Sequence, residues 1–518
     1  MAPLANPLSA LERSDTPWNL AESFLEAGET AAVEKFHARL EGPKKLDTAR
    51  RVASLLELYR GNYGPARDRL REISGQDEWC LSRGKYLDGL LAASDDFVET
   101  GSEHFRIRTS PNDAFLAEYV QRALENSHSK MAEVFHLEPS SGVVVEIYPT
   151  ETRFSRASTL SPETLERSGA IGICKFRRLM VLSPQATPMG YRWLDALSHE
   201  YVHFLINEIS GTLCPLWLHE GVARYYETAW RRAGPFEHTP AAETQLARAA
   251  QKQPDDPSAL VRFQRMEPSM VYLDNQEQVS LAFTEVSDAV AYLLEEFSPE
   301  KLFELLAAFR KYPREEAFER MLGMSEEDFE EAWRDSLKDR SWVTSRGAMD
   351  QKISLRPMDE TEFLGPDVRG HIRLGDRLRQ QDQMAAALVE YKKALEREPD
   401  NGVALLKTAR VFLALGNESE AEEALRHAVK KNPAYVTPYA VLGGVLSEQG
   451  RYEEAQPVLE EGLEINPFHP ELHRALGLIA VDIGHFSAAR KSLELALRLN
   501  PNDSELREVL RRMPKESR

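Results

Sequence analysis

The stretch Trp193-Leu-Asp-Ala-Leu-Ser-His-Glu-Tyr-Val-His-Phe-Leu-Ile-Asn207 has helical apolar spacing and contains the pattern H-E-x-x-H. Residues four apart lie on one face of a helix, within about 6 Å of each other. His199 and His203 can therefore bind one Zn²⁺, and Glu200 between them can reach a water bound to the metal. The alternative is a buried helix whose histidines only satisfy hydrogen bonds. We favour the metal-binding helix, because histidine is costly in a core without partners.

A second helical stretch, Leu-Trp-Leu-His-Glu-Gly-Val-Ala, begins at Leu216. Sixteen residues separate His203 from Glu220, enough for a turn and an antiparallel return of the chain. The glycine and alanine that follow Glu220 allow this second helix to approach closely. Two histidines and one carboxylate leave the fourth position of a tetrahedral zinc for water, as a catalytic site requires. We therefore predict one Zn²⁺ per chain, bound by His199, His203 and Glu220.

The pattern His199-Glu200-x-x-His203, followed by Trp-Leu-His-Glu220-Gly-x-Ala, resembles the gluzincin branch of zinc metallopeptidases. The likeness is closer to the peptidase MA-like domains of bacterial proteins and covers about residues 105–340. It implies an α+β zincin-like domain that hydrolyses peptide bonds, with Glu200 as general base for the zinc-bound water. The spacing to Glu220 is two residues shorter than in the aminopeptidase branch, and the sequence has no G-x-M-E-N-type segment. Aminopeptidase specificity is therefore not implied.

The transition-state stabiliser is less clearly marked. In the MA-like pattern a Tyr-x-x-Ser segment follows the zinc helices, and the matching stretch here reads Ala-Phe283-Thr-Glu-Val-Ser. Phe283 has no hydroxyl, so this alignment leaves one catalytic group missing. Asp195, one turn before His199, is a candidate to accept the other N–H of that histidine. The candidate substitutes for the missing hydroxyl are Tyr226, Tyr272, His219 and His238.

The surrounding residues predict a mixed α+β domain. Residues 113–136 have helical apolar spacing, whereas 143–148 and 178–182 are typical of buried strands. Residues 236–340 are mainly helical. In gluzincins an edge strand beside the active helix pairs with an extended substrate, so we expect the same use of this sheet.

A 34-residue period dominates the carboxy-terminal part. Small residues recur in three further registers, where they let paired helices touch, and a proline ends each second helix. The period resembles tetratricopeptide repeats, which form an all-α solenoid with a groove for a peptide or protein partner. The groove positions lack the lysine and asparagine cluster that clamps a chain-terminal carboxylate in some members of this family. The prolines are Pro399, Pro433, Pro467 and Pro501, and the repeats are 368–401, 402–435, 436–469 and 470–503.

These signals divide the chain of 518 residues into several parts and predict a mainly helical protein. Residues 1–104 are helical, either degenerate repeats of the same kind or a plain helical bundle. The predicted peptidase domain, 105–340, precedes a linker at 341–367. The four repeats at 368–503 are followed by a capping helix and tail at 504–518.

Composition limits the environment and the partners. No stretch of eighteen apolar residues and no secretory signal is present, and the three cysteines are scattered and cannot all pair. We therefore expect a cytoplasmic protein without a membrane span. The net charge of −19 argues against nucleic acid as a partner.

Three functions fit these observations. The first is a zinc metallopeptidase whose repeats recruit a protein or peptide substrate. The second is an adaptor that retains the peptidase fold with weak or lost catalysis, and whose repeats mediate protein–protein interaction. The third is a zinc hydrolase that acts on another class of bond. Phe283 favours the second function, whereas the complete set of His199, Glu200, His203 and Glu220 opposes it.

Overall fold

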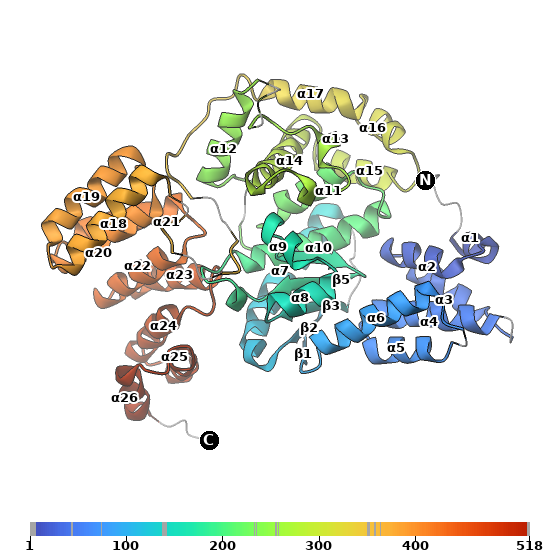
Figure 1. The fold of residues 1–518 in the computed structure, drawn as a ribbon, viewed down its shortest axis with the longest axis horizontal. Helices are drawn as coiled ribbons and strands as arrows, with labels where there is room; N and C mark the ends of the chain where they lie inside the picture. Colours follow the sequence, from blue (N-terminus) through green and yellow to red (C-terminus); the bar gives the residue numbers. More distant parts are fainter. Residues whose placement is uncertain are drawn as a thin grey trace. The chain divides into compact units, whose positions relative to one another are not determined.

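The chain folds into two compact units. The first unit comprises Met1–Ser183, Leu194–Phe236 and Arg248–Arg340, and the second comprises Pro184–Trp193, Glu237–Ala247 and Ser341–Arg518. Figure 1 shows the elements of this computed structural model with their labels. The structure describes residues 7–42, 45–73, 75–136, 142–232, 234, 236–253, 256, 258–349, 353–356, 359–362 and 364–514.

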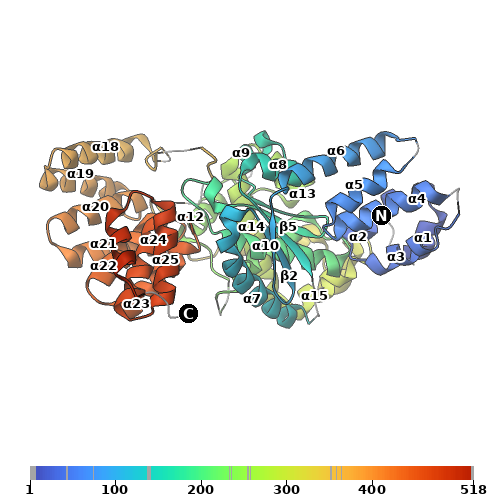
Figure 2. The same ribbon diagram turned by 90° about the horizontal axis from the view of Figure 1, so that it is seen from below.

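The first unit contains a five-stranded sheet with the strand order β1-β2-β3-β5-β4. Figure 2 labels β2 and β5 of this sheet. The three central strands are parallel, and β1 and β4 pair antiparallel at the two ends. The predicted strands 143–148 and 178–182 are confirmed as β3 and β5, whose residues are all buried. The other strands, which are short and at least partly exposed, were not predicted. The bounds are β1 Val98–Gly101, β2 Phe105–Thr109, β3 Val143–Tyr148, β4 Gly172–Lys175 and β5 Arg178–Leu182.

A buried ion pair joins the two central strands. Arg178 Nη1 on β5 donates to Glu146 Oε2 on β3 at 2.9 Å, and both side chains are fully buried. The hydroxyl of Tyr63 hydrogen-bonds to both charged groups, and the hydroxyl of Tyr148 donates to Glu146 at 2.7 Å. Tyr63 lies on α5, so this polar cluster also anchors the amino-terminal helices to the sheet.

The predicted helical character of the amino-terminal region is confirmed in its described residues up to Ala93. In the α4–α5 pair, Gly61 forms the turn with φ of 78° and Ala66 is fully buried. Pro65 lies in the first turn of α5, where a proline is tolerated. The bounds are α1 Pro7–Arg13, α2 Pro17–Glu26, α3 Thr30–Ala38, α4 Leu46–Tyr59, α5 Tyr63–Arg71 and α6 Glu78–Ala93.

Helices before and after the sheet complete the first unit. The helix predicted at 113–136 is confirmed as η2 and α7, and the region 236–340 is mainly helical as predicted. No helix in the described part of the chain is long and apolar enough to cross a membrane. The bounds are η2 Pro111–Leu116, α7 Ala117–Phe135, α8 Glu151–Ser158, α9 Pro162–Ser168, α10 Trp193–Ser210, α11 Leu216–Tyr226, α13 Phe263–Met266, η4 Met270–Tyr272, α14 Gln276–Glu296, α15 Pro299–Ala308, α16 Arg314–Leu322 and α17 Glu326–Ser336.

The second unit contains four successive helix pairs that follow the 34-residue period, and then a final helix. The glycines of the first helices allow close approach: a Cβ at Gly443 would lie 2.3 Å from Leu459, and one at Gly477 would lie 2.4 Å from Leu493. The bounds are η3 Pro184–Ala186, α12 Pro240–Ala250, α18 Pro366–Gln380, α19 Met384–Arg397, α20 Gly402–Ala414, α21 Glu418–Lys431, α22 Val436–Glu448, α23 Tyr452–Leu463, α24 Pro470–Asp482, α25 Phe486–Leu499 and α26 Ser504–Arg512.

The second unit also contains Pro184–Trp193, which lies inside the predicted range 105–340. The Arg192 guanidinium donates to the Pro433 carbonyl at 2.6 Å and to Glu461 at 2.8 Å. The backbone N–H of Tyr191 donates to a carbonyl of the α23–α24 turn at 2.8 Å. The segment that leads into α10 therefore packs with the repeats, which local sequence patterns did not indicate.

Arg178→Met should destabilise the first unit by about 3–5 kcal/mol, because it removes the fully buried cation that pairs with Glu146 and leaves that carboxylate only the more distant Arg108 guanidinium at 3.5 Å. Urea unfolding followed by circular dichroism measures this change. The control is Arg39→Met, which removes an exposed ion pair with Glu12 and should have little effect. Equal effects of the two substitutions would contradict the anchoring role of the buried pair.

Candidate metal centre

The two histidines of α10 and Glu220 of α11 form one cluster. The Glu220 Oε2 atom lies 3.4 Å from His199 Nε2 and 3.3 Å from His203 Nε2. One ligand atom from each residue lies within 4.8 Å of the others. Tetrahedral bonds of about 2.0–2.1 Å place neighbouring ligand atoms about 3.3 Å apart, so the observed separations from Glu220 fit a zinc ion. The structure thus brings together the three residues predicted as ligands.

Gly221 allows α11 to pack close enough for Glu220 to reach the two histidines. A Cβ at Gly221 would lie 2.4 Å from the carbonyl oxygen of Val286 on α14, a backbone atom that cannot move aside freely. On α11, Trp217 and Val222 are fully buried. The close contact between α11 and α14 therefore fixes Glu220, and only glycine fits at the following position.

The buried charges favour a cation at this cluster. Burial raises the pKa of Glu220, but the opposing effect of His203 and His199 is larger and holds it well below its usual range. Burial lowers the pKa of His199, whereas its hydrogen bonds to Glu220 and Glu227 raise it to about 10. An ionised carboxylate is therefore stabilised by positive charge here. A divalent metal would supply that charge in place of protonated histidines, and the imidazoles would bind it in their neutral form.

Glu227 positions His199 from the other side of the ring. Its Oε2 atom lies 3.2 Å from His199 Nδ1, and Arg224 Nη1 donates to its other oxygen at 2.6 Å. A carboxylate at this position fixes the imidazole tautomer so that Nε2 faces the metal. This role of Glu227 was not predicted. Its spacing of seven from Glu220, two turns along α11, was the available signal.

Asp195, the candidate that the sequence suggested for this role, has other partners. Its carboxylate accepts hydrogen bonds from Trp230 Nε1 at 3.0 Å and from Arg231 at 2.8 and 2.6 Å. These bonds tie the first turn of α10 to the segment after α11. We therefore assign Asp195 to holding the helix start.

His219 lies against the second histidine of the cluster. Its ring stacks on that of His203 with a centroid distance of 4.5 Å, and its Nε2 atom lies 3.0 Å from Asn207 Oδ1. Burial and the neighbouring His203 lower the pKa of His219 to about 3, so it is neutral at physiological pH. His219 is therefore a candidate stabiliser that packs directly on a candidate metal ligand.

The other three candidates lie in different surroundings. Tyr226 is buried and packs edge-on against Phe135 at a centroid distance of 5.5 Å. Tyr272 on η4 is 70% exposed, and His238 belongs to the second unit, before α12. Phe283 on α14, by contrast, lies next to the cluster, with its ring centroid 6.4 Å from that of His199. The family pattern therefore located a residue of the site, and that residue carries no hydroxyl.

Glu200 is held between α10 and the edge strand β4. Its side chain is buried, and burial is the main cause of its raised pKa, which the nearby His203 and His199 and a hydrogen bond from the Cys174 backbone partly offset. A Cβ at Gly172 would lie 2.5 Å from Glu200 Oε1. Glycine on β4 thus leaves space for the carboxylate that was predicted as general base.

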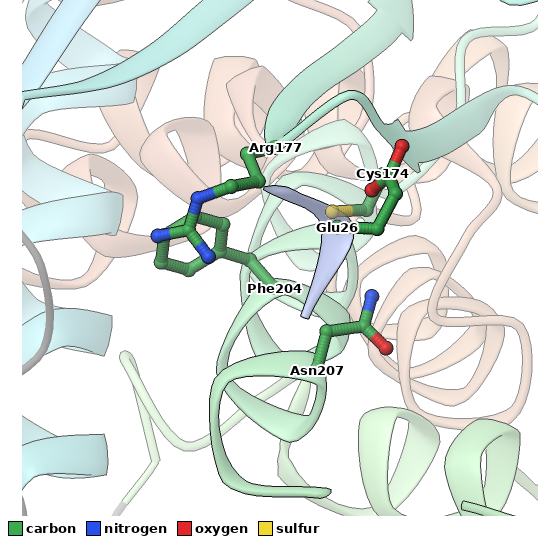
Figure 3. A pocket seen from close by; sticks show the side chains of 5 residues that line it. All are labelled: Glu26, Cys174, Arg177, Phe204 and Asn207. Carbon is green, nitrogen blue, oxygen red and sulfur yellow. The ribbon is translucent and has the colours of Figure 1, made fainter. Parts of the chain in front are cut away.

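A pocket adjoins β4 and α10 (Figure 3). It is lined by Glu26, Cys174, Arg177, Phe204 and Asn207. In the close-up, the Cys174 thiol points toward the space, and Phe204 and Asn207 approach it from α10. Glu26 lies on α2, so the amino-terminal helices contribute to the surroundings of α10, which carries His199 and His203. The three cysteines, all within the described residues, form no disulfide.

Comparison with known proteins places the repeats in a family. Residues 378–440 and 446–513 match the tetratricopeptide repeat family. DnaJ homolog subfamily C member 3 of Rattus norvegicus is 33% identical over 85 residues, and its Homo sapiens counterpart is 32% identical over 85 residues. Each match covers 16% of this chain and 17% of the relative, so the chain spans less than a fifth of these proteins. The helix pairs of the second unit are tetratricopeptide repeats, as predicted.

Solved structures of repeat proteins are also similar over part of the chain. The thermophilic TPR protein TTC0263 of Thermus thermophilus is 31% identical, with a TM-score of 0.25, and the match covers 28% of this chain and 79% of that one. PilF of Pseudomonas aeruginosa is 28% identical, with a TM-score of 0.27, and the match covers 28% of this chain and 66% of that one.

Purified wild-type protein should contain about one zinc per chain, and His203→Ala and Glu220→Ala should each lose it, since each removes a ligand. Elemental analysis after dialysis against zinc measures the content. Glu200→Gln serves as the control, because it preserves all three ligands. Wild-type protein without zinc, or zinc retained in both ligand variants, would contradict the assignment.

Glu227→Gln should weaken zinc binding by about 10–100-fold, because a neutral amide orients the His199 imidazole less well than a carboxylate. Competition with a chromophoric chelator measures the affinity. Glu319→Gln, on the exposed face of α16, makes the same chemical change away from the cluster. The two variants should differ in affinity; identical values would show that Glu227 does not position the ligand.

Proposed function

We propose that this protein is a zinc-dependent metallopeptidase of the gluzincin type whose tetratricopeptide repeats recruit a protein substrate or partner. One observation carries the enzymatic part: His199, His203 and Glu220 converge at separations that suit zinc, with the buried Glu200 beside them. The α+β arrangement of the first unit, with its small sheet next to α10, supports a zincin-like domain.

The residues of the site divide the work of peptide hydrolysis. His199, His203 and Glu220 would hold the zinc, which would supply a water of lowered pKa and a Lewis acid for the scissile carbonyl. The raised pKa of Glu200 suits a carboxylate that takes up a proton and then gives it to the leaving amine. Glu227 keeps the His199 imidazole in one tautomer, and α11 holds Glu220 against α14.

The edge strand supports an extended peptide as substrate. β4 is the last strand of the sheet and pairs with β5, and Gly172 on it lies against Glu200. A peptide that pairs as an additional strand with the other edge of β4 would lie alongside α10. Main-chain hydrogen bonds to such an edge give affinity without strict dependence on side chains.

A second function, that of a peptidase-like adaptor with weak or lost catalysis, is favoured by two observations. Phe283 lies beside His199 where the family pattern has a tyrosine, so this position supplies no hydroxyl to a developing oxyanion. The family match falls on the repeats, which bind protein partners in such solenoids. The comparisons thus support protein–protein interaction more directly than hydrolysis, and an activity assay separates the two functions.

Glu200→Gln should abolish hydrolysis of a quenched fluorescent peptide library while leaving the zinc content unchanged, because it removes the base but no ligand. Phe283→Tyr is the companion variant: it should raise the rate if the missing hydroxyl limits catalysis. Wild-type and Glu200→Gln rates that are equal, at full zinc occupancy, would exclude the peptidase mechanism and leave the adaptor function.

A further inference from the structure

An acidic segment between the two predicted domains lies on the tetratricopeptide repeats. The segment comprises the described residues Asp359–Glu362, within the predicted linker, and we call it the acidic segment. The Asp359 side chain accepts a hydrogen bond from the Thr361 N–H at 2.9 Å, and the Glu362 N–H donates to the Asp359 carbonyl at 2.8 Å. This turn presents the Glu360 side chain to the repeats.

Glu360 binds the first helix and the last residue of the second repeat. Its Oε1 atom lies 3.1 Å from Lys407 Nζ on α20, and its other oxygen accepts a hydrogen bond from the hydroxyl of Tyr435. Lys407 also pairs with Asp376 on α18 at 3.1 Å. Asp376 lies in the first repeat, so Lys407 links the first two repeats. Lys407 and Tyr435 therefore form one receptor for a carboxylate, which we call the Lys407 receptor, and Asp376 shares the Lys407 ammonium group with that carboxylate.

The contacts suit an exchangeable ligand. If Glu360 leaves, Asp376 still pairs with Lys407, so no buried cation loses its last partner. The buried hydroxyl of Tyr435 does lose the carboxylate that accepts its hydrogen bond, and this loss is costly. A replacement must therefore offer an oxygen acceptor to Tyr435 and a negative charge to Lys407. A side-chain carboxylate on a flexible acidic peptide provides both.

We propose that the acidic segment is an internal ligand of the repeats, which occupies the Lys407 receptor until an acidic segment of a protein partner displaces it. This inference rests on the proposed role of the repeats in recruiting a partner, and it names the chemistry of that partner. Backbone contacts hold the segment on the repeats of its own chain. Arg369 on α18 donates to the carbonyl of Glu362 at 2.7 Å and to that of Leu364, just after the segment, at 2.6 Å.

The test measures binding of a fluorescein-labelled peptide with the sequence of residues 356–365 to the full chain by fluorescence anisotropy. Glu360→Gln should bind the peptide about tenfold more tightly than wild type, since the internal competitor is weakened. Adding Lys407→Met to this variant should remove the gain. Glu448→Gln, an exposed glutamate at the end of α22, removes the same charge elsewhere and should behave as wild type.

A peptide with glutamine in place of its Glu360 equivalent provides a readout that requires no protein variant, and it should bind at least tenfold more weakly. Equal affinities for wild type, Glu360→Gln and Glu448→Gln would overturn the inference, as would equal binding of the two peptides or no binding at all. Zinc content and peptide hydrolysis of Glu360→Gln are measured in parallel. If they match wild type, a negative binding result concerns the Lys407 receptor and leaves the proposed function standing.

Discussion

The close contact between α11 and α14 at Gly221 is the constraint on which the candidate metal centre depends. A carbonyl of α14 occupies the place where a Cβ would lie, so the two helix backbones meet without an intervening side chain. This contact fixes the position of Glu220 relative to His199 and His203, and it brings Phe283 of the same α14 next to His199. Gly172 has a similar effect at β4, where it leaves room for Glu200. Two glycines thus bring the elements of the centre together.

Both buried polar clusters of the first unit balance charge, but they do so in different ways. In the sheet, Arg178 supplies a cation for the carboxylate of Glu146, and tyrosine hydroxyls satisfy the remaining oxygens. Such a pair is complete within the chain and serves to hold elements together. At the candidate centre, the carboxylates outnumber the groups that remain positive when the imidazoles are neutral. A bound divalent cation would resolve that imbalance, and we therefore propose this cluster, and not the sheet pair, as a metal site.

Two segments that are not part of the 34-residue repeats bind to the repeats. Arg192, just before α10, binds the carbonyl of a repeat-ending proline and two glutamates of the third repeat. The acidic segment binds Lys407 and Tyr435. Surfaces of a solenoid are made of side chains repeated at fixed intervals, so they offer regular positions for such contacts. We propose that a partner protein can displace the acidic segment from Lys407 and Tyr435.

The amino-acid sequence by itself determined the regular parts of the molecule, whereas only the tertiary structure decided how distant residues meet. The 34-residue period fixed the paired helices, because small residues and prolines at constant intervals act within each repeat and its neighbour. Mainly apolar runs identified β3 and β5, and the four-residue spacing put His199 and His203 on one face of a helix. The Trp-Leu-His-Glu-Gly pattern indicated Glu220 as the third ligand.

Tertiary packing decided that Glu227 contacts His199 and that Asp195 accepts hydrogen bonds from Trp230 and Arg231. It also decided where the short strands β1, β2 and β4 pair with the sheet. It also docked Pro184–Trp193 on the repeats. Local periodicity reports which face of a helix or strand is buried, and this follows from backbone geometry alone. Which buried faces touch depends on packing between elements far apart in the chain, and no single stretch of sequence carries that information.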